Sequence, residues 1–527
     1  NIIDLCPVGA LNSKPFRFRA RAWEMTQVPL VSPHDGVGTN LYGHILRGRL
    51  MRVVPRANEE INETWIADRD RFSYEGIYSE DRLQSPMVRE GGKWLAVDWE
   101  RALAVAAEGL KSTVSRHGPA ALGVLASPSA TLEELHLVAR VARGLGTANV
   151  DHRLRRRDFR DQAADPAVPG LGVALAEIER LQSILVVGSN LRREIPLVAH
   201  RIRKAALAGA RVSFVNPREF EYRFPVAAQL VSDSAVKSLA ALVRAALEKT
   251  GKAAPDHLNA VQASVGERER AIVEQLLAGE RRAIFVGALA LRHAAYSEIR
   301  ALCAALAELT GATVGYFEEG ANAVGAHLAG VLPHRGAAGK PLQEAGLDAR
   351  AMIESPRKAY LLFGGIEPKA DFGSQRAVDA LAQAEFVVMC TPFVTEELRA
   401  TAHVLLPIGS FAETSGTFVS LEGRWQSFAG AAQPLGAARP GWKLLRVLGN
   451  LLNLAGFEYQ SSEEVRDELR KEATAPVDHR YTGRFKVNGA AATSGTVDVP
   501  MYQIDAILRR APALQKTLDG QARSAVY

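Results

Sequence analysis

Cys6, Cys303 and Cys390 are the only thiols in this chain of 527 residues, and Cys6 stands directly before a proline. A cysteine followed by proline is how one type of iron–sulfur domain ends its ligand set, after three earlier cysteines in a tight run. The chain begins at Asn1 without an initiator methionine, so it reads as the later part of a longer polypeptide. Cys6 is then either the last ligand of such a set or a small apolar side chain packed near a turn.

The other two thiols have apolar neighbours. Cys303 follows Leu302 beside the apolar stripe of a predicted helix, and Cys390 ends the apolar run that starts at Phe386. We expect both to pack in the core. Three widely separated cysteines argue against a disulfide framework and suit a reducing compartment.

Length and composition indicate several globular domains. A chain of 527 residues is too long for one core and predicts two to four domains, and 47% hydrophobic residues is an ordinary content. No apolar run approaches the ~18 residues of a membrane-spanning helix. The net charge of +6 permits acidic partners. Its densest basic stretch, residues 153–160, is short, so we interpret it as a solvated or subunit-facing patch rather than a nucleic-acid site.

Apolar runs alternate with helical patterns through the middle of the chain. These runs are Ala121–Leu125, Ile184–Val187, Arg211–Val215, Ile284–Val286, Tyr360–Phe363 and Phe386–Met389. Thr131 and Glu134 form a capping-box pattern that predicts a helix ending at Gly144 or Gly146. Pro196 predicts the start of another helix. Continuous apolar strands between helices predict parallel sheets that are covered on both faces.

The ends of the chain differ from this middle. Residues 26–100 contain short alternating runs with glycines and aromatics, which predict a small antiparallel β subdomain. Residues 475–500 are rich in Gly, Ala and Thr and predict an extended tail. Residues 501–514 predict one last short helix, interrupted at Pro512.

Two glycine turns follow predicted strands, where backbone N–H groups could meet phosphates. Neither Gly188–Asn190 nor Gly364–Pro368 is a G-x-G-x-x-G fingerprint, so a nicotinamide site is weakly supported. Glu367 would also place a negative charge near any phosphate. We therefore expect plain structural turns.

Four long strings carry a resemblance to a known family. They are IIDLCPVGALNSKPFRFRARAWE at 2–24, VGYFEEGANAVGAHLAGVLPH at 314–334, the stretch from HVLLP to ETSGTFVSLEGRWQ at 403–426, and YQIDAILRRAPALQ at 502–515. On these strings the chain resembles the large iron–sulfur subunit of NADH-quinone oxidoreductase, the respiratory complex I. The resemblance covers nearly the whole chain. It implies that Cys6 is the fourth ligand of a [4Fe-4S] cluster in the intact subunit, and that this fragment alone holds no cluster.

The same resemblance implies a second cluster frame, C-x2-C-x3-C with a distant fourth cysteine, as in molybdopterin oxidoreductases. In this chain the frame falls on Ser32, Asp35, Thr39 and Ala67, with 27 residues between the last two. None of these supplies a thiolate, so we expect a degenerate site. Ser32, Asp35 and Thr39 should bond to nearby backbone, and Ala67 should pack. We expect His34 in the same loop to be a surface or hydrogen-bonded side chain.

The fold class that the resemblance implies is α/β and molybdopterin oxidoreductase-like. It has two doubly wound parallel-sheet domains, a small antiparallel β subdomain and no C-terminal β-barrel domain. The predicted division is 1–25 (end of the [4Fe-4S] domain and linker), 26–100 (small β subdomain), 101–150 with 325–430 (first α/β domain), 151–324 (second α/β domain) and 431–527 (C-terminal helix and extended tail).

The resemblance implies a non-redox scaffold for electron transfer from NADH to quinone, with no catalytic residue of its own and no molybdenum or pterin. Its partners would be the other hydrophilic-arm subunits, and membrane association would come only through the complex. The location would be the cytoplasmic side of a bacterial inner membrane, or the matrix side in mitochondria. One alternative is a catalytic molybdopterin oxidoreductase of formate-dehydrogenase type, disfavoured by the missing cluster cysteines and barrel, although a Ser or Asp molybdenum ligand stays open. The other is an independent nucleotide-binding or interaction protein.

Overall fold

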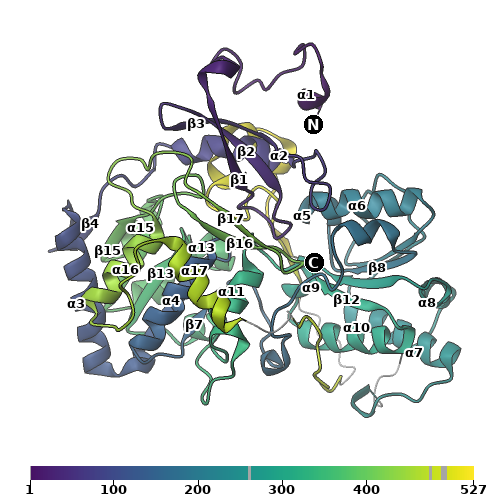
Figure 1. Cartoon of the computed structure of the whole chain (residues 1–527). Helices are drawn as coiled ribbons and strands as arrows, with labels where there is room; N and C mark the ends of the chain where they lie inside the picture. The colour runs from purple at the N-terminus through teal and green to yellow at the C-terminus, as the bar shows by residue number, and fades with distance from the viewer. Residues whose placement is uncertain (1, 259–262, 474–477, 488–494, 527) are drawn as a thin grey trace.

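Two layered α/β lobes stand side by side, with a smaller antiparallel sheet above their junction (Figure 1). The computed structural model describes residues 2–258, 263–473, 478–487 and 495–526. Among these residues, no helix combines the length and the apolar character that crossing a bilayer would require.

The first lobe is built on a seven-stranded sheet. Its strands lie in the order β5 (Lys93–Ala96), β4 (Met87–Glu90), β15 (Val404–Pro407), β14 (Phe386–Thr391), β13 (Ala359–Phe363), β6 (Leu122–Ala126) and β7 (Val150–Asp151). The strands from β15 to β7 run parallel, and Leu361 of β13 lies opposite Val124 and Val388. β6 and β13 are buried along their whole length, as continuous apolar runs between helical layers should be. The strands predicted here from apolar runs are confirmed.

The hairpin β4–β5 extends this sheet in the antiparallel direction. Val88 of β4 pairs with Val404 of β15 and is buried against the core of the first lobe. The prediction that residues 26–100 form one β subdomain is therefore wrong for this hairpin. The hairpin pairs with the edge of β15, whose backbone groups would otherwise lack partners, and it buries an apolar side chain there.

Helices cover both faces of the seven-stranded sheet. They are α3 (Trp99–His117), α4 (Leu132–Gly144), α12 (Ala349–Glu354), α13 (Pro368–Phe372), α14 (Gln375–Ala382), α15 (Glu396–Thr401) and α16 (Gly441–Leu451), with α11 (Ala323–Ala329) and α17 (Ser462–Glu472) packed on α4. The side chains of α3, α4 and α16 share one core with one face of the sheet, and those of α12 and α14 share another. α4 begins at the predicted capping box, where the Thr131 hydroxyl accepts from Glu134 N at 3.3 Å. That helix prediction is confirmed.

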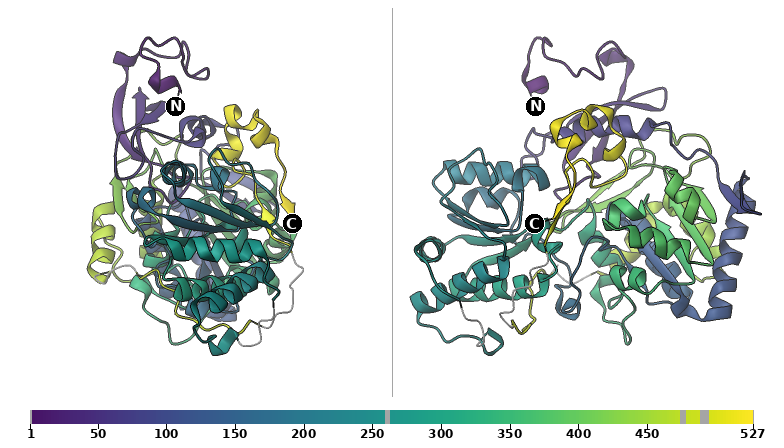
Figure 2. Two further views of the ribbon diagram at one scale, coloured as in Figure 1. Left: turned by 90° about the vertical axis from the view of Figure 1, so that its right-hand side faces the viewer. Right: turned by 180° about the vertical axis from the view of Figure 1, so that it is seen from behind.

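The second lobe has a five-stranded sheet in which all strands are parallel. Their order is β10 (Ala228–Val231), β9 (Arg211–Asn216), β8 (Ser183–Val187), β11 (Arg282–Val286) and β12 (Thr313–Tyr316). Its helices are α5 (Leu191–Glu194), α6 (Pro196–Leu207), α7 (Ala235–Thr250), α8 (Glu267–Ala278), α9 (Ala288–Leu291) and α10 (Tyr296–Thr310). α6 covers one face, and α7, α8 and α10 cover the other (Figure 2). α6 begins at Pro196 as predicted.

The small sheet contains β1 (Thr26–Val31), β2 (Asn40–Leu46) and β3 (Arg49–Pro55), and α2 (Asp68–Phe72) follows it. Leu30, Leu41 and Leu50 pack against Phe418 of the hairpin β16 (Gly416–Val419)–β17 (Trp425–Phe428). Successive side chains of a strand point to opposite faces of the sheet, so the residues that face this shared core are buried and those between them are more exposed.

The C-terminal segment, residues 495–526, runs between the lobes and up to the small sheet (Figure 2). It contains β18 (Val497–Asp498), α18 (Pro512–Gln515), α19 (Leu518–Gln521) and β19 (Ala525–Val526). The single helix predicted over 501–514 is wrong. The Asp505 carboxylate accepts from the N–H groups of Ile507 and Leu508, which forms a turn instead. A short 3-10 helix follows at Leu508–Arg510, and the α-helix begins only at Pro512. The extended tail predicted at 475–500 lies partly outside the described residues.

Candidate functional site

The positions of the degenerate cluster frame gather around the start of α2. Ser32 Oγ donates to Asp70 Oδ1 at 2.5 Å, and Asp70 Oδ2 accepts from Ala67 N at 3.1 Å. One carboxylate of α2 therefore joins two frame positions that are far apart in sequence. Burial raises the pKa of Asp70. Ala67 is buried and stands at the N-cap of α2, where its side chain packs.

Asp35 forms a buried ion pair with Arg69, and its other oxygen accepts from Val37 N at 3.0 Å. Arg69 also donates to the Glu194 carbonyl at 2.9 Å, yet its Nε and its second terminal nitrogen have no hydrogen-bond partner among the described residues. The Thr39 hydroxyl also has no partner in that part of the chain, so the predicted hydrogen bond is not formed. The nearby backbone donors are already used, since Val37 N–H bonds to Asp35.

His34 is buried, with partners on both ring nitrogens. Nδ1 lies 2.8 Å from Asp505 Oδ2, and Nε2 lies 2.7 Å from Ser73 Oγ. The expectation of a hydrogen-bonded histidine is confirmed. Its partner Asp505 belongs to the C-terminal segment, so this bond ties that segment to the loop between β1 and β2.

Cys6 lies in the N-terminal segment, which we define as residues 2–25. Its Sγ accepts from Leu11 N at 3.4 Å, and this bond is the largest cause that lowers the pKa of the thiol. Cys6 is partly exposed, whereas Cys303 in α10 and Cys390 in β14 are buried, as predicted for core residues. Burial raises the pKa of Cys303 to about 12. Of the three thiols, Cys6 is the one that an external group can reach.

Two adjoining cavities, of about 140 and 120 Å³, lie where the lobes meet the small sheet. Both are lined by His34, Arg292, Glu318 and Glu319. The C-terminal segment closes them, with residues 504–507 lining the first and 498–501 the second.

Two arginines anchor the C-terminal segment to the first lobe. Arg509 pairs with Glu367 at 2.6 Å and with Asp371 at 3.1 Å. Arg510 pairs with Glu367 at 2.5 Å and with Asp81 at 2.6 Å. The charge of Glu367, expected to disfavour a phosphate in the turn after β13, is therefore used to hold these arginines.

The two glycine turns serve close packing. A Cβ on Gly188, whose φ is +64°, would lie 2.6 Å from Ala290 N at the next helix. A Cβ on Gly364, whose φ is +92°, would lie 2.7 Å from Ser127 Cβ. Both positions need glycine for backbone conformation and for space, which supports the interpretation as structural turns.

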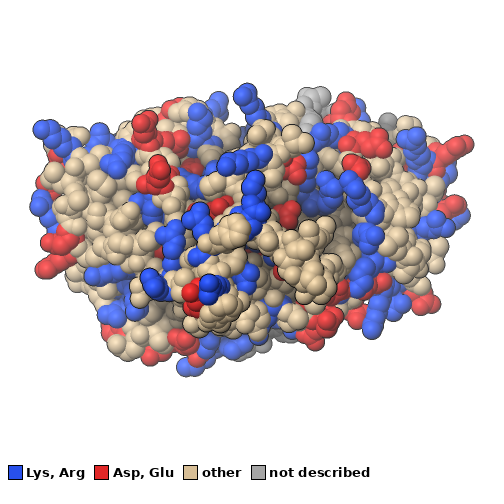
Figure 3. Space-filling view, turned by 90° about the horizontal axis from the view of Figure 1, so that it is seen from above, with Lys and Arg blue, Asp and Glu red and all other residues tan. Residues whose placement is uncertain are grey.

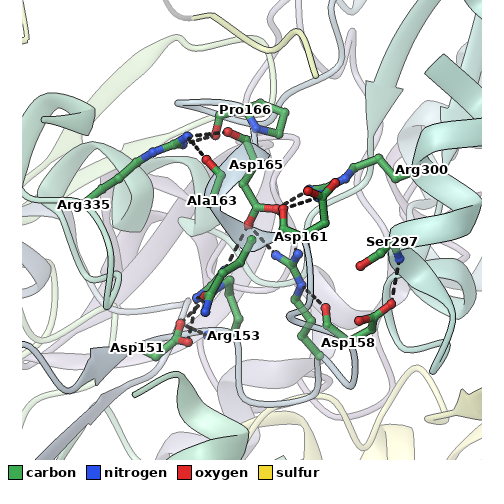
Figure 4. A network of polar contacts seen from close by, with 12 residues as sticks. Asp151, Arg153, Asp158, Asp161, Ala163, Asp165, Pro166, Ser297, Arg300 and Arg335 are labelled. Atoms are coloured by element: carbon green, nitrogen blue, oxygen red, sulfur yellow. Dashed lines mark hydrogen bonds and ion pairs between the residues drawn. The ribbon is translucent and has the colours of Figure 1, made fainter. Parts of the chain in front are cut away.

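The crossover between the lobes, residues 152–166, carries a buried ionic network (Figure 4). Asp165 accepts from Arg153 at 3.0 Å and from Arg156 at 2.6 Å, and it also pairs with Arg300 of α10. Arg153 reaches back to Asp151 at the end of β7, at 2.8 Å. Burial would raise the pKa of Asp165, but Arg156 and Arg300 hold it well below its usual range. One carboxylate thus joins the two lobes.

This network corrects the interpretation of residues 153–160 as a solvated or subunit-facing patch. Arg153 is buried, the side chains of Arg155 and Arg156 are only 10% and 9% exposed, and Arg155 pairs with Glu319 and Asp371. Only the end of the stretch is exposed. The missed signal is the acidic residues interleaved with the arginines, namely Asp151, Asp158, Asp161 and Asp165.

The family model for Molybdopterin oxidoreductase matches residues 82–451, which is most of the chain. The chain belongs to this family. A second model, the NADH-ubiquinone oxidoreductase NDSU1/NuoG-like 4Fe-4S domain, matches residues 26–75. The second match covers the small sheet, the degenerate frame and α2.

Curated relatives confirm the resemblance to this subunit of NADH-quinone oxidoreductase. The NADH-quinone oxidoreductase subunit designated G in Rickettsia felis is 25% identical over 99% of this chain and 71% of its own length. The mitochondrial NADH-ubiquinone oxidoreductase 78 kDa subunit of Candida albicans is 29% identical over 91% of this chain and 60% of its own. The alpha subunit of NADPH-Fe(3+) oxidoreductase from Geobacter sulfurreducens is 30% identical over 86% and 59%. The chain therefore spans between 59% and 71% of the length of these relatives.

Among solved structures, acetylene hydratase from Pelobacter acetylenicus has a similar fold. The TM-score is 0.61 at 15% sequence identity, with 82% of this chain and 70% of that chain covered. This likeness supports a mixed α/β fold of the molybdopterin oxidoreductase type.

The residues present do not fit the two cofactors that these families imply. Residues 26–75 contain no cysteine, and the frame side chains there are alanine, a hydroxyl without a partner, or groups engaged with Asp70 and Arg69. The cavities of about 140 and 120 Å³ are also smaller than the ~300–1,000 Å³ of ordinary ligand pockets. Neither cavity alone therefore has the size of an ordinary ligand pocket.

Proposed function

We propose that this chain is the molybdopterin oxidoreductase-like part of the large iron–sulfur subunit of an NADH-quinone oxidoreductase. In this role it supports electron transfer from NADH to quinone without a redox group of its own. The observation that carries the proposal is that 99% of this chain aligns with a subunit of that enzyme. At the positions where a cluster would need cysteines, the chain instead has side chains such as Asp35, which pairs with Arg69.

In this proposal Cys6 is one of four ligands of a [4Fe-4S] cluster in the intact subunit. The cluster supplies one-electron transfer when bound, and a single thiolate of this chain holds one of its irons. Thiolate is the ligand form of cysteine. The Leu11 N–H favours that form, because it donates to Sγ and lowers the pKa of Cys6.

The rest of the chain acts as a scaffold. Asp165 fixes the lobes to each other, and Arg509 and Arg510 fix the C-terminal segment to the first lobe. A unit held in this way offers a rigid surface beside the cluster domain and docks the other hydrophilic-arm subunits. The predicted domain division, with the hairpin β4–β5 moved to the first α/β domain, and a peripheral location on the cytoplasmic or matrix face belong to the same proposal.

The test compares the assembled complex with and without the Cys6 thiol. We expect Cys6→Ala to remove or strongly perturb one [4Fe-4S] signal in electron paramagnetic resonance and to lower the rate of NADH-to-quinone electron transfer. Asn12→Ala, in the same exposed segment, should leave both unchanged. Unaltered cluster spectra in Cys6→Ala would exclude the ligand role.

Metal analysis of the 527-residue chain tests the scaffold role. We expect substoichiometric iron, molybdenum and tungsten. Stoichiometric molybdenum or tungsten together with a pterin would instead favour the catalytic molybdopterin oxidoreductase, which the relatives do not favour.

A further inference from the structure

The N-terminal segment and the β2–β3 hairpin carry a strong charge imbalance. Residues 1–56 contain eight Lys and Arg but only three Asp and Glu. The eight cations are Lys14, Arg17, Arg19, Arg21, Arg47, Arg49, Arg52 and Arg56. Two of the acids are already neutralised, since Asp4 pairs with Arg71 and Asp35 with Arg69. Glu24 is the remaining acid. We name the eight cations and the exposed apolar residues of the N-terminal segment the basic face.

None of the eight cations forms an ion pair within the part of the chain that the structure describes. The crossover arginines are different, because each of those that are buried meets at least one carboxylate. Most of the basic face is also exposed, which leaves its N–H donors open to solvent. The positive charge is therefore not balanced within the described residues.

Aromatic rings hold several of these guanidinium groups in place. Arg52 lies over Phe16 with 4.5 Å to the ring centroid, and Arg49 lies over Tyr78 at 3.7 Å. The Phe16 contact joins the N-terminal segment to β3. A cation above a ring keeps its direction while its donors stay available, so the face is partly organised before any partner binds.

The same face exposes apolar side chains. Twelve large hydrophobic residues are exposed among the described residues, and half of them lie between positions 2 and 23. They are Ile2, Leu5, Val8, Leu11, Phe18 and Trp23. Phe18 is 96% exposed and Trp23 is 77% exposed. Under the proposed function these residues beside Cys6 also border the rest of the cluster domain, so the unpaired charge, and not the apolar side chains, marks the partner surface.

Seen from above, the molecule shows Lys and Arg gathered across the middle of its upper side, where Asp and Glu are fewer (Figure 3). We infer that the basic face docks an acidic surface of a partner polypeptide, and this inference rests on the proposed role as a subunit of a complex. Arginine and aromatic residues together are typical of the centre of protein interfaces. Charge complementarity would also speed the encounter and set its orientation.

A protein partner explains the face better than a lipid surface does. A segment that is both basic and apolar binds a membrane surface most commonly as an amphipathic helix, with its apolar face in the lipid and its polar face in water. The only α-helix among residues 2–25 is α1 (Ile2–Leu5), which has four residues. The apolar residues are instead spread along turns and extended backbone.

The test uses charge reversal in the assembled complex. The triple variant Arg47→Glu, Arg49→Glu, Arg56→Glu changes the face by six charges. The matched control Lys237→Glu, Arg268→Glu, Arg281→Glu makes the same change at exposed positions of the second lobe. We expect the first variant to lower the fraction of subunit recovered with the complex roughly tenfold at low salt, with a smaller difference from the wild type at higher salt, where both attraction and repulsion are screened. The control should stay within roughly twofold of the wild type.

A second measurement locates the partner surface. Arg49→Lys keeps the charge and adds an amine, so a zero-length carbodiimide reagent should link it to an Asp or Glu of a neighbouring subunit. The inference is overturned if the triple variant is recovered with the complex as fully as the wild type. It is also overturned if the complex assembles but Arg49→Lys gives no such cross-link. A third contradicting outcome is that the triple variant assembles normally but no longer binds vesicles containing phosphatidylserine that the wild type binds. If the wild-type chain itself is not recovered with the complex, the proposed function fails instead. Thermal unfolding by circular dichroism, equal in both triple variants, shows that each is folded.

Discussion

Two of the buried ionic regions of this molecule differ in how completely their charges are paired. In the crossover, Asp165 serves three arginines, and each of these has further partners. In α2, Arg69 has one carboxylate and one carbonyl, and two of its nitrogens have no partner among the described residues. The crossover is therefore more fully paired, with only the Nε of Arg300 unpartnered among the three arginines around Asp165, whereas Arg69 is a buried cation that is only half satisfied.

The difference teaches which charges the fold depends on. Burying an ion pair removes both charges from water, and only close, well-oriented contacts offset the free energy of this desolvation. Removing one partner leaves the other charge buried and unbalanced. A well-paired network should therefore be sensitive to single changes. A poorly paired site should tolerate joint replacement by uncharged residues.

The largest effect is expected at Asp165. Replacing Asp165 by alanine leaves the guanidinium groups of Arg153, Arg156 and Arg300 with less balance in the interior. We expect the free energy of unfolding to fall by about 5 kcal/mol, or the chain not to accumulate. Urea unfolding measures this. Asp467→Ala, at an exposed residue paired with its neighbour Arg466, should leave the midpoint unchanged. A small loss in Asp165→Ala would show that the network does not hold the lobes.

The next effect concerns the buried pair of Asp35 and Arg69. Asp35→Ala strands Arg69 in the interior and should cost about 3 kcal/mol in the same measurement. The double variant Asp35→Ala, Arg69→Met should recover most of that loss, because no buried charge remains. If the double variant is as unstable as Asp35→Ala, the Asp35–Arg69 pair stabilises the protein more than its incomplete pairing suggests. The contrast drawn above between this pair and the crossover network would then be wrong.

A third test uses pH, at a buried carboxyl that has hydrogen bonds but no ion pair. Burial raises the pKa of Glu133 to about 7, while Thr417 donates to both of its oxygens. A raised carboxyl pKa contributes stability that is fully present below the unfolded value and is lost as pH rises through about 7.

In the wild type the free energy of unfolding should fall between pH 5 and pH 7 as Glu133 loses its proton. In Glu133→Gln this fall should be about 2 kcal/mol smaller. Urea unfolding at the two pH values measures the difference. The exposed substitution Glu108→Gln is the control and should leave the pH dependence of the wild type. An unchanged slope in Glu133→Gln would mean that this carboxyl is ionised in the folded protein.

The smallest effect is expected at the exposed end of the crossover. The Arg160 side chain is 52% exposed and pairs with Asp158 and Glu298. Solvent screens such pairs, so Arg160→Ala should cost less than about 1 kcal/mol. Arg156→Ala, four positions earlier and buried, should cost several times more in the same assay. Equal costs would remove the distinction between the exposed and buried parts of this stretch.

Patterns that are local in sequence were predictable. The Thr131–Glu134 capping box marked the start of α4, the apolar runs marked the buried strands, and apolar neighbours marked Cys303 and Cys390 as core residues. The spacing of Ser32, Asp35 and Ala67 also pointed to a region that the structure assembles around α2.

Contacts between distant residues were not predictable. His34 meets Asp505, and Arg510 meets Asp81, across more than 400 positions of sequence. The partners of Arg153 and Arg156 depend on how the crossover folds between two lobes, so a run of arginines was mistaken for a surface patch. The edge position of β4–β5 likewise depends on which sheet edge is free.

The C-terminal segment also determines the order in which the molecule can be completed during synthesis. Chains fold progressively as they leave the ribosome, with earlier domains first. Both sheets are fully encoded before residue 410, whereas the residues that seal the cavities lie between 498 and 507. The lobes can therefore form while the space between them is still open to water. Arg509 and Arg510 close it only after both lobes have formed, so a nascent chain stalled before residue 498 should present a cleft without the C-terminal segment that lines it in the complete structure.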